Sequence, residues 1–211
     1  MKVKSSDQIL DELTIMFPNA KTELNYQDGY QLLVAVMLSA QSTDVVVNQI
    51  TPNLFKAYPT FYDLSLATSE AVAKIIKRIG LYKTKAKNLV AMAQIIVTQF
   101  DSKLPNTQAQ LMTLPGVGPK TANVVLSEWF KIPAIAVDTH VFRVAKRLRL
   151  ASEDANVAQV EVALNQNIKK ERWNQAHHLL ILFGRYKCKA RQPLCDDCPF
   201  FNFCRYQNPD L

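Results

Sequence analysis

The segment Leu114–Asn123 gathers residues that suit phosphate binding and nucleophilic chemistry. It reads Leu-Pro-Gly-Val-Gly-Pro-Lys-Thr-Ala-Asn, and two of the chain's five glycines, Gly116 and Gly118, lie in it. Glycines spaced in this way allow a tight backbone turn whose N–H groups point outward toward an anion. Lys120 follows at the predicted start of a helix, where the positive end of the helix dipole disfavours its ammonium form. The segment therefore predicts a phosphate-binding hairpin that presents a nucleophilic amine.

Asp138 is the second candidate for catalysis, because it follows Lys120 by 18 residues and precedes another predicted helix. That spacing leaves room for one helix and a reversal that can bring both side chains to the same cleft. A carboxylate beside a neutral amine offers proton transfer and stabilises positive charge developing on a sugar ring. The simpler alternatives are a helix cap for Asp138 and a phosphate contact for Lys120. The pairing of the two favours the catalytic interpretation.

The chain's four cysteines all lie in its last 24 residues, namely Cys188, Cys195, Cys198 and Cys204. No targeting segment is apparent, so we expect an intracellular protein, in which structural disulfides are uncommon. Four thiolates at this spacing can close around one tetrahedral zinc ion or one iron-sulfur cluster. Zinc ribbons usually pair two Cys-x-x-Cys knuckles, and only one such pair is present here. Spacing alone leaves both metals open.

Composition and charge favour a folded protein with a polyanionic partner. Apolar residues make up 48% of the 211 residues, charged residues 20%, and the net charge is +7. Six basic residues and no acidic one lie in Lys74–Lys87, and Lys189 and Arg191 lie between the first two cysteines. A solvated helix face is the plain alternative for the first group. We expect both groups to contact a phosphate backbone. No apolar run approaches membrane-spanning length, which predicts a soluble protein.

Apolar residues recur at helical spacing almost throughout the chain, which predicts an all-α fold. The run Gln31–Leu38 is almost wholly apolar, so its helix is expected at the centre of a core. Gly80 is expected in the left-handed conformation that ends a helix. Asp28, Thr43, Thr107 and Asp138 are expected helix caps. The predicted helices span about 7–17, 31–38, 44–57, 61–66, 69–79, 83–100, 108–112, 119–130, 139–150, 157–168 and 173–183.

Together these features resemble the endonuclease III family of bifunctional DNA glycosylases in the helix-hairpin-helix superfamily. The resemblance covers nearly the whole chain. A Gly-x-Gly hairpin alone is common among DNA-binding proteins, but the hairpin lysine, the later aspartate and the cysteine pattern in this order point to one group. The matching motifs are Leu-Ser-Ala-Gln at 38–41 with Thr43-Asp44, Ile-Gly-Leu-Tyr at 79–82, the hairpin at 114–123, Val-Asp-Thr-His at 137–140, and the terminal cysteines.

The resemblance implies an all-α protein of two lobes. One is a six-helix barrel over residues 22–132, with the helix-hairpin-helix motif at about 107–130. The other is a discontinuous helical lobe made of residues 1–21 and 133–211. Lys120 and Asp138 would lie in the cleft between the lobes, and the four cysteines would bind a 4Fe-4S cluster.

The resemblance further implies excision of oxidised pyrimidines such as thymine glycol from duplex DNA, after the damaged nucleotide is flipped out of the stack. The amine of Lys120 would attack the sugar C1′, displace the base and form a Schiff base, and β-elimination would cleave the 3′ side of the abasic site. Asp138 would assist by deprotonation and by stabilising the cationic sugar. The implied protein is a cytoplasmic monomer associated with the nucleoid, whose partner is double-stranded DNA with oxidised pyrimidines or abasic sites.

Gln41 and Leu81 match positions that family members insert into the gap left by the flipped nucleotide. The alternatives are an ordinary loop amide and a half-buried leucine. Pro119 stands where the family often has arginine, which removes one cation and one backbone donor at the hairpin. Proline suits the first turn of a helix, so the fold is expected to survive with an altered phosphate contact. The remaining matches are Gly116, Gly118 and His140 as DNA-binding positions, and Ser39 and Asp44 near the pocket.

Three other classes of protein compete with this interpretation. Adenine-mismatch glycosylases share the hairpin and the cluster, but they lack a lysine at the nucleophile position and usually carry a further C-terminal domain. A non-catalytic or redox-sensing iron-sulfur protein that binds DNA would have no need of the Lys120 and Asp138 pair. A zinc-stabilised DNA-binding module would be colourless, whereas an iron-sulfur protein is brown.

Overall fold

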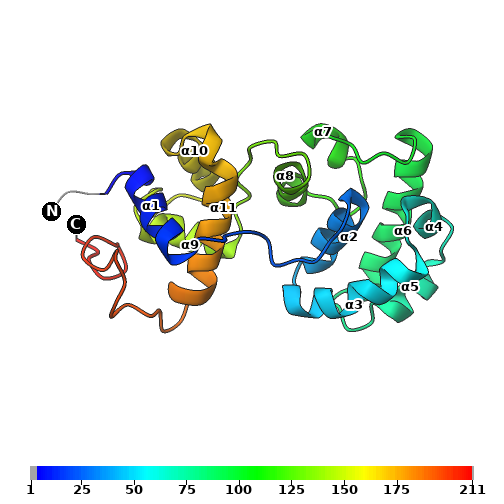
Figure 1. Ribbon diagram of the computed structural model, residues 1–211, viewed down its shortest axis with the longest axis horizontal. Coiled ribbons are helices and arrows are strands. Elements are labelled where there is room, and N and C mark those ends of the chain that lie inside the picture. Colours follow the sequence, from blue (N-terminus) through cyan, green and yellow to red (C-terminus); the bar gives the residue numbers. More distant parts are fainter. Residues whose placement is uncertain (1–3, 211) are drawn as a thin grey trace. The chain divides into compact units, whose positions relative to one another are not determined.

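The computed structural model describes residues 4–210, which fold as two compact units (Figure 1). Unit 1 is Met1–Thr22 with Ile132–Leu211, of which residues 1–3 and 211 lie outside the described part, and unit 2 is Glu23–Lys131. All regular secondary structure within residues 4–210 is helical, which confirms the predicted all-α class. None of the helices in this range is long and apolar enough to cross a membrane.

Unit 2 is built around α2, which is buried along nearly its whole length, as its apolar sequence predicts. The carboxylate of Asp28 caps this helix by accepting from the N–H of Gln31 at 2.7 Å. Helices α3, α6 and α8 pack against α2 and complete the core. The helices of this unit are α2 (Gly29–Ser39), α3 (Asp44–Ala57), α4 (Phe61–Ser65), α5 (Ser69–Ile75), α6 (Tyr82–Gln99), α7 (Gln108–Leu111) and α8 (Pro119–Glu128).

Unit 1 joins the two ends of the chain in one core. Ile9, Leu10 and Leu13 of the first helix are buried in the same cluster as Val141 and Val144, which lie far along the sequence. Burial of this apolar stripe holds the N-terminal helix to the C-terminal part of the chain. The elements are α1 (Ser6–Met16), α9 (Thr139–Arg147), α10 (Val157–Asn167), the 3-10 helix η1 (Lys170–Arg172), α11 (Trp173–Leu182) and the π-helix η2 (Phe183–Lys187).

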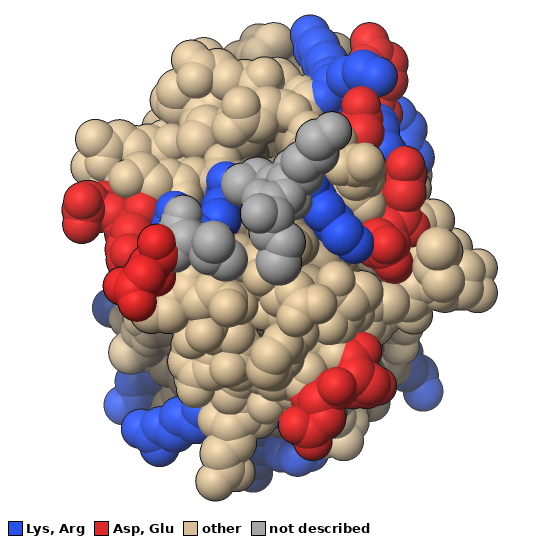
Figure 2. All heavy atoms as spheres, turned by 90° about the vertical axis from the view of Figure 1, so that its left-hand side faces the viewer, with Lys and Arg blue, Asp and Glu red and all other residues tan. Residues whose placement is uncertain are grey.

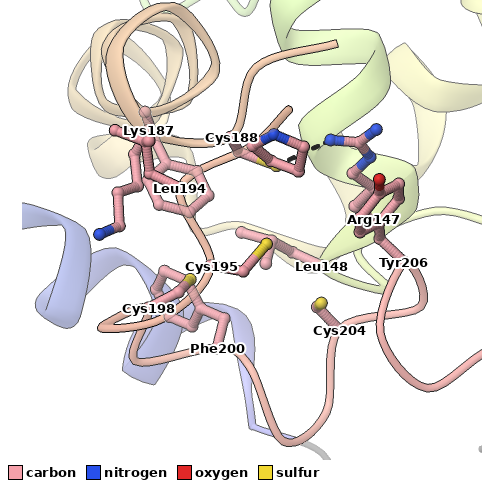
Figure 3. A pocket seen from close by; sticks show the side chains of 12 residues that line it. Arg147, Leu148, Lys187, Cys188, Leu194, Cys195, Cys198, Phe200, Cys204 and Tyr206 are labelled. Carbon is pink, nitrogen blue, oxygen red and sulfur yellow. Dashed lines mark hydrogen bonds between the residues drawn. The ribbon is translucent and has the colours of Figure 1, made fainter. Parts of the chain in front are cut away.

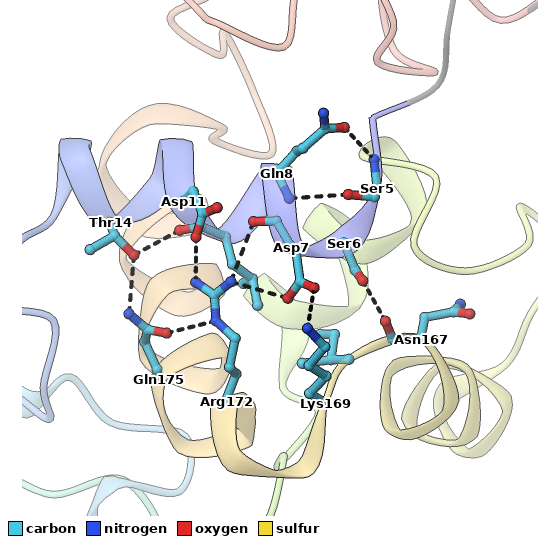
Figure 4. A network of polar contacts seen from close by, with 12 residues as sticks. Ser5, Ser6, Asp7, Gln8, Asp11, Thr14, Asn167, Lys169, Arg172 and Gln175 are labelled. Carbon is cyan, nitrogen blue, oxygen red and sulfur yellow. Dashed lines mark hydrogen bonds and ion pairs between the residues drawn. The ribbon is translucent and has the colours of Figure 1, made fainter.

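A polar network between α1 and the segment that follows α10 reinforces this association (Figure 4). Arg172 pairs with Asp7 at 3.1 Å and with Asp11 at 2.9 Å, and Lys169 pairs with Asp7 at 3.0 Å. The hydrogen bonds from Lys169 and Arg172 lower the pKa of the Asp7 carboxyl. Both cations follow α10 in sequence, so the network connects the two chain segments that make up unit 1.

The connection between α5 and α6 differs from its prediction. Helix α5 ends at Ile75 rather than near residue 79, and Gly80 is not left-handed, so its predicted role as a left-handed helix end is wrong. The left-handed residue is Leu81, with φ 57°. A Cβ on Gly80 would lie 3.3 Å from the carbonyl oxygen of Gln41, so the glycine permits a close approach of two loops.

Candidate DNA-processing site

The hairpin between α7 and α8 has the tight geometry that its glycines predict. Gly116 has φ +80°, and a Cβ there would lie 2.8 Å from the side-chain nitrogen of Asn88 on α6, so both conformation and space require glycine. Leu114 and Val117 are buried and anchor the hairpin to the core. A Cβ added at Gly118 would have no other described residue within 4 Å, apart from its two neighbours in the chain. The backbone before α8 is therefore open to a ligand.

Lys120 lies in the first turn of α8, two residues after the N-cap Gly118, and its side chain is exposed. Pro119 occupies the first position of the helix, where a missing N–H costs no intrahelical hydrogen bond, as expected. The unbonded N–H groups of a helix's first turn attract anions. The start of α8 therefore combines an anion-binding backbone with an exposed amine.

Gln41 and Leu81 occupy two loops of unit 2 that touch each other at Gly80. Both residues are exposed, and both have left-handed backbones, with φ 57° in each case. Such a conformation is uncommon for residues other than glycine and clusters at functional sites. Leu81 is 62% exposed, so the alternative of a half-buried leucine is wrong for this structure.

Ser39 and Asp44 flank the loop that carries Gln41. Ser39 is half-buried in the last turn of α2, and its hydroxyl donates to the carbonyl of Val36 at 2.9 Å. Asp44 is the first residue of α3, directly after the cap Thr43. An acidic residue in a first turn favours the helix through its dipole. Both residues thus have a local structural role beside any role toward a ligand.

Asp138 is the N-cap of α9, as predicted. Its Oδ1 accepts from the N–H groups of His140 and Val141, each at 2.8 Å. Two such bonds fix the orientation of a half-buried carboxylate. Asp138 belongs to unit 1 and Lys120 to unit 2. The capping role of Asp138 is therefore observed directly, and any chemical role adds to it.

His140 packs where α9 meets the π-helix η2. A Cβ on Gly184 would lie 2.9 Å from the Cβ of His140, so glycine is needed for this contact. The ring Nδ1 of His140 lies 3.3 Å from Nη2 of Arg143. Arg143 in turn donates to the carbonyls of Gly184 at 2.7 Å and Cys188 at 3.1 Å. The start of α9 is thereby joined to Cys188, the first residue of the segment 188–204 that carries the four cysteines and is called the cysteine loop below.

The four cysteines line one pocket of about 320 Å³, a volume that includes its open mouth (Figure 3). None of these described thiols is in a disulfide. Burial raises the pKa of the Cys188 and Cys198 thiols. The other lining residues are Arg147, Leu148, Phe183, Lys187, Pro193, Leu194, Phe200 and Tyr206.

This pocket fits an iron-sulfur cluster. Its four thiols match the ligand set in number and type, and its walls are largely apolar, which suits a group sheltered from water. Among the described residues no three potential ligands are close enough to hold one metal ion. A 4Fe-4S cluster binds each thiolate through a different iron, so its ligands need not converge on a single point.

Arginines of and beside α9 hold the cysteine loop in place. Arg147 donates to the sulfur of Cys188 at 3.3 Å and to the carbonyl of Lys189 at 2.8 Å, and it lies over the ring of Tyr206. Arg149 donates to the carbonyl of Phe203 at 2.8 Å. No role is predicted for Arg147 or Arg149 from the sequence. The recurrence of arginine at 143 and 147, one helical turn apart, is the signal that could have indicated one.

We expect Arg147→Met to weaken cluster retention. The change keeps an apolar stem but removes the donor to Cys188 and the anchors of the loop backbone. Visible absorbance of the cluster per protein, followed during exposure to an iron chelator, should decay several-fold faster than in the wild type. Lys21→Met, which removes an exposed cation of the same unit, is the control. Equal decay rates in Arg147→Met and the wild type would contradict the anchoring role.

The expected phosphate-contacting cations are mostly exposed. In the segment Lys74–Lys87 only Lys85 is half-buried, and the other five basic residues are exposed, as are Lys189 and Arg191. The face shown in Figure 2 has red and blue groups side by side on a mostly uncharged surface. The net charge of +7 is therefore not displayed as a uniform basic patch on that face.

The chain is similar to known DNA repair proteins. The family described as HhH-GPD superfamily base excision DNA repair protein matches residues 34–170, and the iron-sulfur binding domain of endonuclease III matches residues 188–204. Endonuclease III of Rickettsia felis is 48% identical over 208 residues, covering 97% of each chain. Endonuclease III of Bacillus subtilis is 44% identical over 205 residues, covering 97% of this chain and 94% of its own.

Two solved structures extend the comparison. A trapped covalent intermediate of endonuclease III with DNA has a TM-score of 0.93 and 44% identity, covering 98% of both chains. A non-covalent complex of endonuclease III with DNA also has a TM-score of 0.93, at 45% identity, covering 96% of this chain and 95% of the other.

Proposed function

Because the chain belongs to the endonuclease III family of base excision DNA repair proteins, we propose that it removes oxidised pyrimidines from duplex DNA and cleaves the resulting abasic site. The chain is thus a bifunctional DNA glycosylase and abasic-site lyase whose partner is damaged double-stranded DNA. The observation that carries this proposal is the exposed amine of Lys120 at the start of α8, in a fold shared with an endonuclease III trapped covalently on DNA. A covalent intermediate requires a nucleophile.

We assign the nucleophile to Lys120. Its neutral amine attacks C1′ of the damaged nucleotide, and the electron pair of the glycosidic bond leaves with the base, which takes up a proton. Opening of the sugar ring then gives a protonated Schiff base between C1′ and Nζ. This cation acidifies the C2′ proton, and its removal expels the 3′ phosphate by β-elimination. Hydrolysis of the Schiff base returns the free lysine.

Asp138 assists as a carboxylate. It removes a proton from the Lys120 ammonium and stabilises positive charge on the sugar as the base departs. The two N–H groups of α9 that bind its Oδ1 hold the side chain in one orientation, so no ordering is needed during the reaction. The capping role observed for Asp138 therefore supports its chemical role.

The hairpin and the exposed loops bind the DNA. The backbone around Gly116 and Gly118 receives a phosphate at the start of α8, and Pro119 lowers the number of donors there without disturbing the helix. Gln41 and Leu81 enter the gap left by the flipped nucleotide. The further DNA-facing positions that we propose are His140 at the start of α9, Ser39 and Asp44 beside the Gln41 loop, and the exposed cations of Lys74–Lys87, through which the protein associates with nucleoid DNA.

Cys188, Cys195, Cys198 and Cys204 hold the 4Fe-4S cluster. When bound, the cluster supplies a rigid cross-link of the loop and a redox-active centre. The chain's own contribution is to present Lys189 and Arg191 from that loop to a phosphate backbone.

A duplex with one thymine glycol opposite adenine tests the proposal. We expect release of the base, a strand break on the 3′ side of the site, and a covalent protein–DNA adduct when borohydride is present. A duplex with adenine opposite 8-oxoguanine serves as the comparison substrate. Adenine release without strand cleavage and without an adduct would instead assign the chain to the mismatch-glycosylase branch.

A further inference from the structure

Lys85 has an unusual set of partners for a lysine beside an exposed loop. Its Nζ donates to the carbonyl of Leu38 at 2.8 Å and to the carbonyl of Ala40, and it lies 3.5 Å from the hydroxyl of Ser42. These acceptors are all neutral. They belong to the end of α2 and to the loop that follows it, whereas Lys85 lies on α6.

The position of the ammonium group matches the electrostatics of a helix end. The last carbonyls of a helix lack intrahelical partners and carry partial negative charge, which a cation stabilises. Two of the acceptors, on Ala40 and Ser42, stand immediately before and after Gln41. The ammonium group of Lys85 therefore contacts the residues on both sides of Gln41, the residue of this loop that has a left-handed backbone.

The same lysine is attached to the second loop. Its backbone N–H donates to the carbonyl of Leu81 at 3.0 Å in the first turn of α6. The neighbouring Gly80 approaches the Gln41 loop so closely that an added Cβ would lie 3.3 Å from the Gln41 carbonyl oxygen. Burial lowers the pKa of the Lys85 side chain, which fits a cation drawn inward from solvent. Both exposed loops thus meet at Lys85.

We propose that Lys85 is a positioning residue that holds Gln41 and Leu81 at a fixed separation for joint insertion into the DNA duplex. This inference rests on the proposed function, because it requires that a nucleotide be flipped out. Each left-handed residue stores backbone strain that the surrounding structure has to hold in place. Without the hydrogen bonds to Leu38 and Ala40, the Gln41 loop is free to relax, and the gap must then be filled by loops that are no longer pre-organised.

Lys85→Met tests the role, since it keeps the apolar stem and removes the donors. We expect kcat/KM for excision of thymine glycol from duplex DNA to fall by about 10- to 100-fold, the size of effect that a misplaced positioning group produces. Cleavage of an abasic site in single-stranded DNA needs no extrusion of a base from a stack, so it should stay within about twofold of the wild type. Lys85→Arg, which keeps the charge and donors, should recover most of the duplex activity.

The control is Lys56→Met, which removes an exposed cation of α3 in the same unit and should leave both activities unchanged. A second variant, Gly80→Ala, disturbs the same junction without a change of charge, because its new Cβ presses on the Gln41 carbonyl. It should show the same selective loss on duplex substrate, and it keeps the test decisive if Lys85→Met does not fold.

Salt dependence separates positioning from direct phosphate contact. A lost phosphate contact would weaken binding to undamaged duplex and would reduce the slope of log K against log salt by about 0.9. A positioning role leaves that slope unchanged in Lys85→Met. Equal losses on duplex and single-stranded substrates, or a reduced slope, would overturn the inference. Absence of any excision or adduct in the wild type would instead refute the proposed function.

Discussion

Lys120→Ala is expected to abolish the borohydride-trapped adduct and to lower base excision and strand cleavage by at least about 10⁴-fold, as removal of a nucleophile does in other enzymes. The reason is chemical, since no covalent bond to C1′ can form without the amine. Denaturing gel electrophoresis of the duplex after borohydride treatment measures the adduct directly. A persistent adduct in Lys120→Ala would mean that another group attacks the sugar.

Loss of fold is not a competing explanation for such a result. Lys120 is exposed in the first turn of α8, where its positive charge faces the positive end of the helix dipole. Removing it should leave the melting temperature unchanged or raise it slightly, because alanine is also the better helix former. Lys103→Ala, an exposed lysine before α7, is the matched control and should retain full activity.

Asp138→Asn is expected to slow turnover by about 10²- to 10⁴-fold while binding to damaged DNA is retained. The amide oxygen of asparagine can accept the same two N–H groups of His140 and Val141, so the cap on α9 survives. The variant therefore removes the proton acceptor and the negative charge without removing the structural role. Single-turnover excision kinetics beside a binding titration measure the two effects separately.

Asp138→Ala provides the comparison that isolates the cap. It should lose turnover to a similar degree and, in addition, about 1 kcal/mol of stability, because the start of α9 loses its acceptor. Thermal denaturation of the two variants shows this difference. Unchanged turnover in Asp138→Asn would reduce Asp138 to a helix cap and would leave the proton transfer to another residue.

Local sequence determined the helices, their caps and the order of the chemical motifs. Asp28, Thr43 and Asp138 cap helices as predicted, because an N-cap depends on a side chain and the N–H groups two or three residues later. The apolar run of α2 predicted its burial for a similar reason, since a helix without a polar face has to lie inside a core. The cysteine spacing likewise predicted a metal centre from short-range pattern alone.

Tertiary structure decided the features that depend on contacts between distant segments. Position 80 favours glycine because the Gln41 loop lies close to it. The left-handed conformation that was expected at Gly80 is found at Leu81 instead. The sequence predicts no role for Arg147, whereas the packing of α9 against the π-helix directs its side chain to Cys188. Lys85 is 45 residues from Ala40 in sequence, and only the packing of α6 against α2 brings its ammonium group to that carbonyl. Such contacts produce no periodic pattern in the sequence. Each of them depends on where two helices meet in the fold and not on the neighbouring residues of the chain.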